Sequence, residues 1–317
     1  MSLAESVLRC LGQGQVRLRQ DLCQELNIYP EELAAACREL TDLGLVFRDA
    51  GADSLQLAAA IDWLDPVRLG SAASTLGLDL AITGLCASTN LSLAGDLDQR
   101  QLPCALLAEG QSGGRGRRGR GWSSPPGGGI YLSIAWRCPR PLTELAALGL
   151  IASLAAARAL NGFDLPPVKV KWPNDLQVGG RKLGGCLVDV SGAATGPSEV
   201  VIGLGINVQL PATTGIDQPW TDLHQLGCTA DRTSLACALL EVLVQALRTF
   251  DTHGSQPLLA DWPDLDALFG QTVEVSWDDG RRLLGTASGI DALGRLRITA
   301  ADGKHHIHSG DIRVRAA

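Results

Sequence analysis

Four arginines interleaved with glycines, at Arg115, Arg117, Arg118 and Arg120, mark the segment EGQSGGRGRRGRGWSSPPGGGIYLSI. Arginine carries a planar, permanently charged set of donors that matches phosphate and carboxylate oxygens. Glycine lets the backbone approach a ligand closely and adopt positive φ angles. The segment therefore predicts a loop that closes over a polyphosphate. It lacks the G-x-x-x-x-G-K-S/T pattern, so it is not a Walker loop.

Two plainer interpretations of this arginine loop remain. It is either a solvated surface loop or a disordered RNA-binding segment on which Trp122 stacks. The loop lies inside a folded region, however, and leads directly into the apolar run IYLSIAW. Disordered segments concentrate at chain termini, so the ligand-binding interpretation is preferred.

A second group of polar residues lies in VKVKWPNDLQVGGRKLGGCLVDV. In a strand, the three apolar residues of VKVKW face one side, while Lys169 and Lys171 face the other. The amide of Asn174 offers a fixed donor and acceptor, and the Asp175 carboxylate suits Mg²⁺ or a donor group. We predict that Lys171, Asn174, Asp175 and Lys182 form a site together, whereas Lys169 alone is better explained as a solvated strand position.

The first 62 residues predict a small helical unit. AESVLRCL, RQDLCQEL and PEELAAACRELTDLG carry apolar residues at helical spacing, and LGLVFRDAGADSLQLA predicts two short strands around a turn. Three helices followed by a hairpin are typical of a winged helix-turn-helix. The expected recognition helix begins with Glu31 and Glu32, which would face DNA phosphates badly. DNA binding and a residual regulatory or packing role both stay open.

The rest of the chain divides into two parts with different sequence patterns. Strand-like and helix-like segments are mixed over residues 63–268, which predicts one domain of α and β structure. From residue 269 onward, short runs broken by Asp-Gly turns predict a small all-β barrel. The histidines in KHHIH are better explained by an exposed strand than by a metal site.

Length, net charge and cysteine content limit the kinds of protein that this chain can be. A chain of 317 residues suggests two or three domains, and a net charge of −7 gives no general attraction to nucleic acid or anionic membranes. The nine cysteines include no C-x-x-C pair and no zinc-like spacing. Their odd number in a chain this long argues against a disulfide framework, which favours reduced thiols and a cytoplasmic location. The apolar run from Leu145 to Ala157 is too short for a bilayer and predicts a buried helix.

Four segments, GRGRRGRGW, KWPNDL, RKLGGCLVD and VIGLGINV, occur in this order after AST and Asn90. With them the whole chain resembles the bifunctional bacterial biotin–protein ligase family. The resemblance implies an α+β fold: a central mixed β-sheet with helices, like class II synthetases and the biotin/lipoate ligases. It also implies a winged helix-turn-helix at 1–62, a biotin and ATP catalytic domain at 63–268 and an SH3-like β-barrel at 269–317.

The family's activity implies a two-step reaction. Biotin and ATP give biotinyl-5′-adenylate, and biotin then passes to a lysine of a carrier. That carrier is the biotin carboxyl carrier protein of acetyl-CoA carboxylase or another biotin-accepting carboxylase domain. Cationic side chains and Mg²⁺ would offset the repulsion between the carboxylate and the triphosphate. A glycine-rich loop that closes over the adenylate would exclude water. A homodimer and repression at operator DNA are further family expectations.

The resemblance also assigns roles to residues. Positions matching those that hold the biotin ureido ring are Ser88, Thr89, Asn90, Gln111 and the loop residues Gly114, Arg115, Gly116 and Arg117. Positions matching groups that meet the carboxylate, the adenylate and the phosphates are Arg115, Arg117, Arg120 and Lys182. Positions on the nucleotide side are Lys171, Asn174, Asn207 and Trp220, with Asp175 as the weaker magnesium ligand. For Trp122 and Trp172, core packing is an equal alternative.

Three positions depart from the family pattern. Asp189 stands where glutamate is usual, Cys186 where a branched aliphatic residue is common, and Gly110 where a larger residue is expected beside the biotin pocket. A lipoate–protein ligase of the same fold is one alternative function. A DNA-binding regulator without catalysis and an RNA-binding protein are two others.

Overall fold

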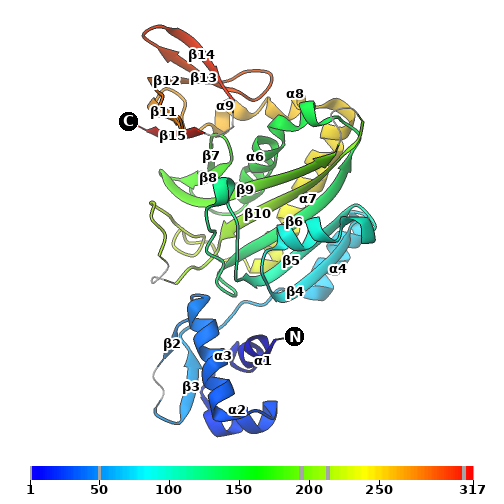
Figure 1. Cartoon of the computed structure of the whole chain (residues 1–317), viewed down its shortest axis with the longest axis vertical. Coiled ribbons are helices and arrows are strands. Elements are labelled where there is room, and N and C mark those ends of the chain that lie inside the picture. The colour runs from blue at the N-terminus through cyan, green and yellow to red at the C-terminus, as the bar shows by residue number, and fades with distance from the viewer. Residues whose placement is uncertain (1, 49–50, 193–195, 212–214, 309–311, 317) are drawn as a thin grey trace.

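The computed structural model describes residues 2–48, 51–192, 196–211, 215–308 and 312–316. An N-terminal helical unit and a C-terminal sheet lie at opposite ends of the long axis, with a larger sheet and its helices between them (Figure 1).

The N-terminal unit has three helices and a three-stranded antiparallel sheet of order β1-β3-β2. Its elements are α1 (Leu3–Leu11), β1 (Arg17–Leu18), α2 (Arg19–Leu26), α3 (Pro30–Asp42), β2 (Phe47–Arg48) and β3 (Ser54–Leu57). The three helices and the two hairpin strands agree with the sequence prediction, whereas β1 was not predicted. Residues 49–50 at the hairpin tip lie outside the described residues. The unit has its own apolar core, which includes Leu22, Leu33 and Leu40.

The central part is built on a seven-stranded mixed sheet of order β4-β5-β6-β10-β9-β8-β7, in which only β4 and β5 run parallel. Its strands are β4 (Asp79–Cys86), β5 (Cys104–Gln111), β6 (Gly129–Cys138), β7 (Lys169–Lys171), β8 (Asp175–Val178), β9 (Arg181–Gly192) and β10 (Ser198–Asn207). Its helices are α4 (Pro66–Thr75), α5 (Thr89–Gly95), η1 (Leu97–Gln99), η2 (Arg117–Gly119), η3 (Leu142–Ala147), α6 (Leu148–Leu160), α7 (Arg232–His253), α8 (Gln256–Leu259) and α9 (Trp262–Leu265). The fold is thus α+β, as predicted.

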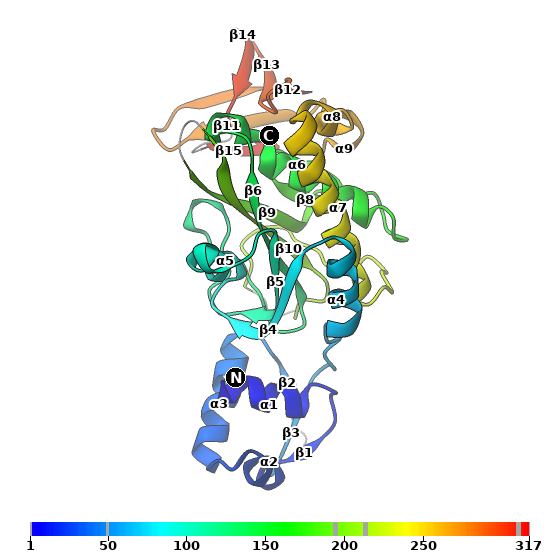
Figure 2. The same ribbon diagram turned by 90° about the vertical axis from the view of Figure 1, so that its right-hand side faces the viewer.

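The strands separate two apolar layers because successive side chains point to opposite faces. Leu107 of β5 and Ile202 of β10 belong to the large core with α6 and α7. Leu106 and Val201, their neighbours in sequence, pack instead with Leu93 of α5. Figure 2 shows α5 on one side of the sheet and α4 and α7 on the other. The polar groups described below lie on the α5 side.

Two helical segments, Leu142–Leu160 and Arg232–His253, are long and apolar enough to cross a membrane by length and composition. However, 67% and 56% of their most apolar stretches are buried inside the protein. They pack against each other in the large core, as helices of a folded domain do. The buried helix predicted from Leu145 to Ala157 is therefore confirmed, and its first residues belong to the 3₁₀ segment that precedes α6.

The C-terminal part is a five-stranded antiparallel sheet of order β14-β13-β12-β11-β15. Its strands are β11 (Thr272–Trp277), β12 (Arg282–Ile290), β13 (Leu296–Ala300), β14 (Gly303–Ile307) and β15 (Ile312–Ala316). Val273 and Ile298 extend the core of the central sheet, so the two sheets share one apolar interior. His305 and His306 each lie 2.8 Å from an aspartate oxygen, of Asp302 and Asp291 respectively.

Candidate functional site

Glycines line part of the α5 side of the central sheet. Four neighbouring strands bring together, side by side, Tyr131, Gly205, Gly185 and Asp175. Two residues before Gly205 in β10, Gly203 pairs with Ser133 of β6. Because glycine has no side chain, groups from α5 and the arginine loop can lie directly on this part of the sheet.

One end of this surface carries a buried network of neutral hydrogen-bonding groups. Ser88 caps the start of α5, and Thr89 donates to Gln111 Oε1 from its backbone N (2.9 Å) and its hydroxyl (3.2 Å). Gln111 Nε2 in turn donates to Ser124 Oγ at 2.8 Å. All four residues are buried. The sequence-predicted set of Ser88, Thr89 and Gln111 is therefore brought together.

Asn90 extends the network from these neutral groups toward Asp189. The Ser133 hydroxyl donates to Asn90 Oδ1 at 2.5 Å, and Asn90 Nδ2 donates to Asp189 Oδ2 at 3.1 Å. The sequence prediction missed Ser133 and Ser124. The signal for Ser133 was present, because it is the single polar residue in the apolar run IYLSIAW.

The position of Asn90 depends on Gly203. A Cβ atom at residue 203 would lie 2.1 Å from Asn90 Oδ1. We expect Gly203→Ala to displace Asn90 and to lower the free energy of unfolding by about 1–3 kcal/mol, as overpacking does. Gly149→Ala in α6 is the matched control, because its Cβ would meet only Val188 Cγ2 at 3.7 Å. In a helix interior that change stabilises by roughly 0.5–1 kcal/mol. Denaturant unfolding of both variants should give opposite signs, and equal signs would contradict the packing argument.

The arginine loop, residues 112–124, is folded into a closed hairpin. Trp122 N donates to Gly114 O, and Gly116 N donates to Arg120 O, both at 2.8 Å. Its first residues, Ser112 and Gly113, donate to the carbonyls of residues 86 and 87 at the end of β4. The loop is thus held against the end of the sheet and next to α5.

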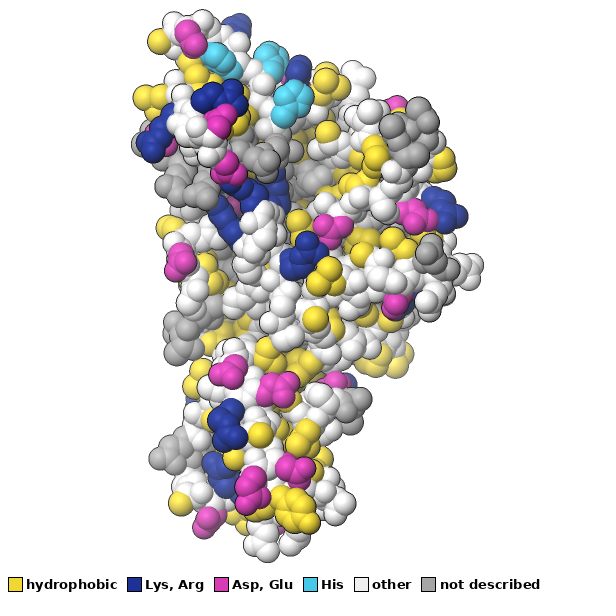
Figure 3. Space-filling view, viewed as in Figure 1, with side chains coloured by type: hydrophobic (Ala, Val, Ile, Leu, Met, Phe, Trp, Pro, Cys, Tyr) yellow, Lys and Arg dark blue, Asp and Glu magenta, His cyan; other side chains and the backbone are white. Residues whose placement is uncertain are grey.

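The loop arginines point toward four different places. Arg115 Nη1 lies 3.7 Å from Asp189 Oδ2, and Arg117 Nη1 donates to Asn174 Oδ1 at 3.4 Å. Arg118, which has a positive φ of 61°, forms an ion pair with Asp278 in the turn between β11 and β12. The side chain of Arg120 is exposed. In the space-filling view, Lys and Arg side chains gather between the C-terminal sheet and the central sheet (Figure 3).

Lys182 and Asp175 form the charged centre of the site. Lys182 Nζ lies 2.7 Å from Asp175 Oδ1 and 5.3 Å from the centre of the Trp122 ring. The pairing of β8 with β9 shifts between Leu176 and Gln177, which leaves Leu183 as an extra residue in β9. This bulge lets Leu183 enter the core while Lys182 faces Asp175.

The remaining nucleotide-side candidates surround this pair. Lys171 is the strand partner of Asp175, and the backbone of Lys182 bridges to Trp220. Asn174 Nδ2 donates to the carbonyl of residue 186 at 2.5 Å. Asn207 is buried and donates to the Thr221 carbonyl at 3.0 Å. Each predicted polar residue therefore lies on the same side of the sheet or at its rim.

The two tryptophans left open by the sequence differ in their surroundings. Trp172 is buried, and its Nε1 donates to the Gly294 carbonyl at 2.9 Å, so it packs between the two sheets. Trp122 lies over Gly205, whose Cβ would stand 2.6 Å from Trp122 Nε1, and it also faces Lys182. Trp172 is a core residue, whereas Trp122 lines the site.

The structure shows the surroundings of two residues that depart from the family pattern, Gly110 and Cys186. A Cβ at Gly110 would meet Pro126 at 3.0 Å and Leu85 at 3.1 Å, so the segment after the arginine loop leaves little room there. Burial raises the pKa of the Cys186 thiol to about 12. This thiol therefore stays protonated and is no nucleophile at neutral pH.

Comparison with known families matches two parts of the chain. Residues 87–207 match the biotin/lipoate A/B protein ligase family. Residues 268–315 match the biotin protein ligase C terminal domain. The first match covers α5, the arginine loop, β7 to β10 and therefore most of the candidate site.

Individual relatives cover more of the chain. The bifunctional ligase/repressor BirA of Salmonella typhimurium is 31% identical over 314 residues, 98% of this chain and 97% of the relative. A biotin--[acetyl-CoA-carboxylase] ligase of Mycobacterium tuberculosis is 34% identical, over 65% of this chain and 77% of that protein. The structure of the Aquifex aeolicus biotin protein ligase in complex with biotin and ATP superimposes with a TM-score of 0.64 at 25% identity, over 75% of this chain and 99% of that chain.

Proposed function

Since this chain belongs to the biotin protein ligase family and is a biotin ligase, we propose that both of its substrates bind on the α5 side of the central sheet. The observation that carries this assignment is that neutral and charged groups are separated at opposite ends of the site. Buried neutral groups lie at one end of the arginine loop, and Lys182, Asp175 and the loop arginines lie at the other.

The neutral end fits the ureido ring of biotin. That ring offers two N–H donors and one carbonyl acceptor. Ser88, Thr89, Asn90 and Gln111 supply hydroxyl and amide groups that can both donate and accept. The backbone of Gly114 to Arg117 closes over the ring. Every such group is uncharged, which suits a neutral ligand in a buried place.

The charged end supports activation of the carboxylate. A biotin carboxylate oxygen attacks the α-phosphorus of ATP, the bond to the bridging oxygen breaks, and pyrophosphate leaves. Lys182, Arg115, Arg117 and Arg120 offset the repulsion between these anions and stabilise the charge that develops. Asn174, Asn207 and Trp220 receive the adenine, and Lys171 faces the phosphates from β7.

A magnesium ion is the expected companion of the triphosphate. Such an ion usually takes one or two protein carboxylates and completes its shell with phosphate oxygens and water. Asp175 fits as that single carboxylate because it lies beside Lys171 and Lys182, where the phosphates are proposed to bind. When bound, the ion would neutralise phosphate charge.

Transfer to the carrier requires the loop to open. The ε-amino group of the carrier lysine attacks the acyl carbon of the adenylate, the acyl–oxygen bond breaks, AMP leaves and the amine loses a proton. We infer that residues 112–124 cover the adenylate until the carrier arrives, because this anhydride hydrolyses in water. The carrier is a biotin carboxyl carrier protein or a similar carboxylase domain.

The flanking parts support a three-domain organisation. We infer a winged helix-turn-helix at 1–62, a catalytic domain at 63–268 and an SH3-like barrel at 269–317. The free thiols of all nine cysteines favour a cytoplasmic enzyme. A homodimer in the presence of ligand is a further proposal from the family.

Mass spectrometry tests the assignment of substrate. Purified protein, ATP, Mg²⁺ and a carrier domain are incubated with biotin or with lipoate. We expect one carrier lysine to gain the mass of a biotinyl group and AMP to appear in equal amount. Lipoylation without biotinylation would overturn the choice of biotin.

Repression of transcription is a second candidate function, favoured by the ligase/repressor name of the Salmonella relative. The surface of α3 opposes it, because Glu31, Glu32, Glu39 and Asp42 are exposed there beside a single exposed Arg38. Titration of DNA from the chain's own operon at several salt concentrations decides, with and without biotin and ATP. Sequence-specific binding that tightens with both ligands supports repression, and absence of binding at low salt removes it.

A further inference from the structure

A fully buried ion pair outside the proposed substrate contacts joins α7 to β5. Arg232, the first residue of α7, is 0% exposed, and Glu109 of β5 is 4% exposed. Arg232 Nη1 lies 2.7 Å from Glu109 Oε2. A buried pair of this kind pays a large desolvation cost, and apolar residues of similar size often stabilise a fold as well or better. The pair is therefore better explained by what it positions than by stability alone.

Arg232 contacts both ends of the segment that contains the arginine loop, residues 109–129. Glu109 lies two residues before Gln111, at the end of β5. Arg232 Nε donates to the Gly129 carbonyl at 3.1 Å, at the start of β6. One guanidinium thus holds residue 109 before the loop and residue 129 after it.

Backbone contacts carry this constraint to the biotin side. Gly127 N donates to the Glu109 carbonyl at 2.9 Å, and Gln111 N donates to the Ser124 carbonyl at 3.0 Å. Gln111 and Ser124 are also joined through their side chains. A shift of residue 109 against residue 129 would therefore move Gln111, which orients Thr89.

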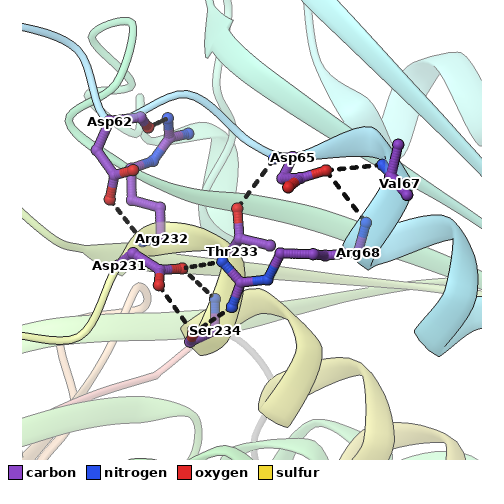
Figure 4. Close-up of polar contacts among 8 residues, drawn as sticks. All are labelled: Asp62, Asp65, Val67, Arg68, Asp231, Arg232, Thr233 and Ser234. Carbon is purple, nitrogen blue, oxygen red and sulfur yellow. Dashed lines mark hydrogen bonds and ion pairs between the residues drawn. The ribbon is translucent and has the colours of Figure 1, made fainter.

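The linker between the N-terminal unit and the central sheet, residues 58–65, contacts the start of α7 through Asp62 and Asp65 (Figure 4). Arg232 Nη1 donates to the Asp62 carbonyl, and Asp62 Oδ2 accepts from the Arg232 backbone N, both at 2.6 Å. Glu109 Oε1 accepts from Leu64 N at 3.0 Å. The linker thus supplies hydrogen bonds to both charged groups and shields them from water.

We propose that Arg232 and Glu109 are positioning residues for the biotin pocket. The guanidinium fixes the two ends of the arginine-loop segment relative to each other and to the linker, so that Gln111 and Thr89 are set for the ureido ring. This role rests on the proposed biotin site. It requires the forked shape of arginine, because Nε and Nη1, held at a fixed separation, reach partners on different segments that a single ammonium does not.

Arg232→Lys in the full-length chain separates shape from charge. Lysine keeps a positive charge beside Glu109 but gives up the fork. We expect the KM for biotin to rise about tenfold or more, as slight misplacement of a binding group does. The kcat at saturating biotin and the KM for ATP should stay within about twofold. Pyrophosphate release measures all three, at a temperature well below each variant's Tm.

Thr233→Ala is the matched control for this test. Thr233 is buried in the same turn of α7 and accepts from Asp65 N of the same linker at 2.9 Å, a hydrogen bond to the linker and not to either end of the loop segment. It should lower Tm and leave the KM for biotin unchanged. Glu109→Gln provides a second probe of the pair, with the same rise in KM expected.

The outcomes separate this inference from the site assignment. An unchanged KM for biotin in folded Arg232→Lys and Glu109→Gln overturns the positioning role. Failure of both variants to fold makes the pair a folding determinant and also overturns it. Gln111→Ala tests the biotin site itself. If that variant binds biotin normally, the proposed site is wrong, whatever the Arg232 variants do.

Discussion

Replacement of Lys182 by alanine is expected to slow biotinyl-adenylate formation by about 10²- to 10³-fold, the usual cost of losing a charged group that stabilises a transition state. Lys182 is the cation that pairs with Asp175 at 2.7 Å. It lies next to the bulge in β9, on the glycine-lined side of the sheet. Its partners, Asp175 and the Trp122 ring, lie in the site and outside the apolar core cluster, so the fold should survive. The rate of pyrophosphate release on mixing biotin and ATP measures this step.

Lys169→Ala is the matched control for Lys182→Ala. Lys169 lies on the same side of the sheet, two residues from Lys171 in β7, but it is exposed. It should leave the rate unchanged within about twofold. A normal adenylation rate in Lys182→Ala would remove this lysine from the reacting centre and leave Asp175 as a structural partner only.

Much of the candidate site was predictable because its residues lie in short polar segments that interrupt apolar runs. Asn174, Asp175 and Lys182 stand out in this way, and they do lie together. Their exact relation was not predictable. The pairing of Lys182 with Asp175 depends on the bulge at Leu183, and a bulge is set by the pairing of two strands, which local sequence does not reveal.

Three of the elements that the sequence patterns missed have weak local signals. Helix α4 begins with Asp65 as its cap and Pro66 in its first turn, both recognisable signals, but its apolar face is narrow. Strand β8 has only four residues and begins at Asp175. Helix α5 spans only seven residues and is held by tertiary contacts of Leu93. In each case packing against distant segments decides the local structure.

The ion pair of Arg232 and Glu109 was invisible for a related reason. Arg232 lies between Asp231 and Thr233 in a typical helix start, and Glu109 ends an apolar strand next to Gly110. Either residue alone suggests a solvated position. Only the fold places them 2.7 Å apart, 123 residues distant in sequence. Long-range partners of this kind have no local signal.

Asp189, a conservative departure from the family pattern, still contacts both Asn90 and the arginine loop. The family usually has glutamate here, and the shorter side chain still accepts from Asn90 Nδ2 at 3.1 Å and lies 3.7 Å from Arg115. It therefore connects the neutral end of the site to the arginine loop. Its contact with Arg115 is long and half exposed, which makes it weak enough for a ligand carboxylate to replace.

Arg115→Ala should let the bound adenylate escape or hydrolyse about 10- to 100-fold faster, because the loop loses a charged contact that closes it over the anhydride. The KM for biotin should rise as well. The side chain of Arg115 is 41% exposed, so its loss should hardly change Tm. Labelled biotin released from preformed enzyme-bound adenylate, in the absence of carrier, measures the leak directly.

Arg137→Ala controls for the loss of one surface arginine. Arg137 lies on β6 and pairs with Glu199 of β10, away from the loop. Its variant should retain the adenylate as the unmodified enzyme does. If Arg115→Ala also retains it, the loop does not seal the site through this guanidinium, and protection from water must come from another part of residues 112–124. Such a result would leave the adenylation chemistry at Lys182 standing, because the leak is measured after the adenylate has formed.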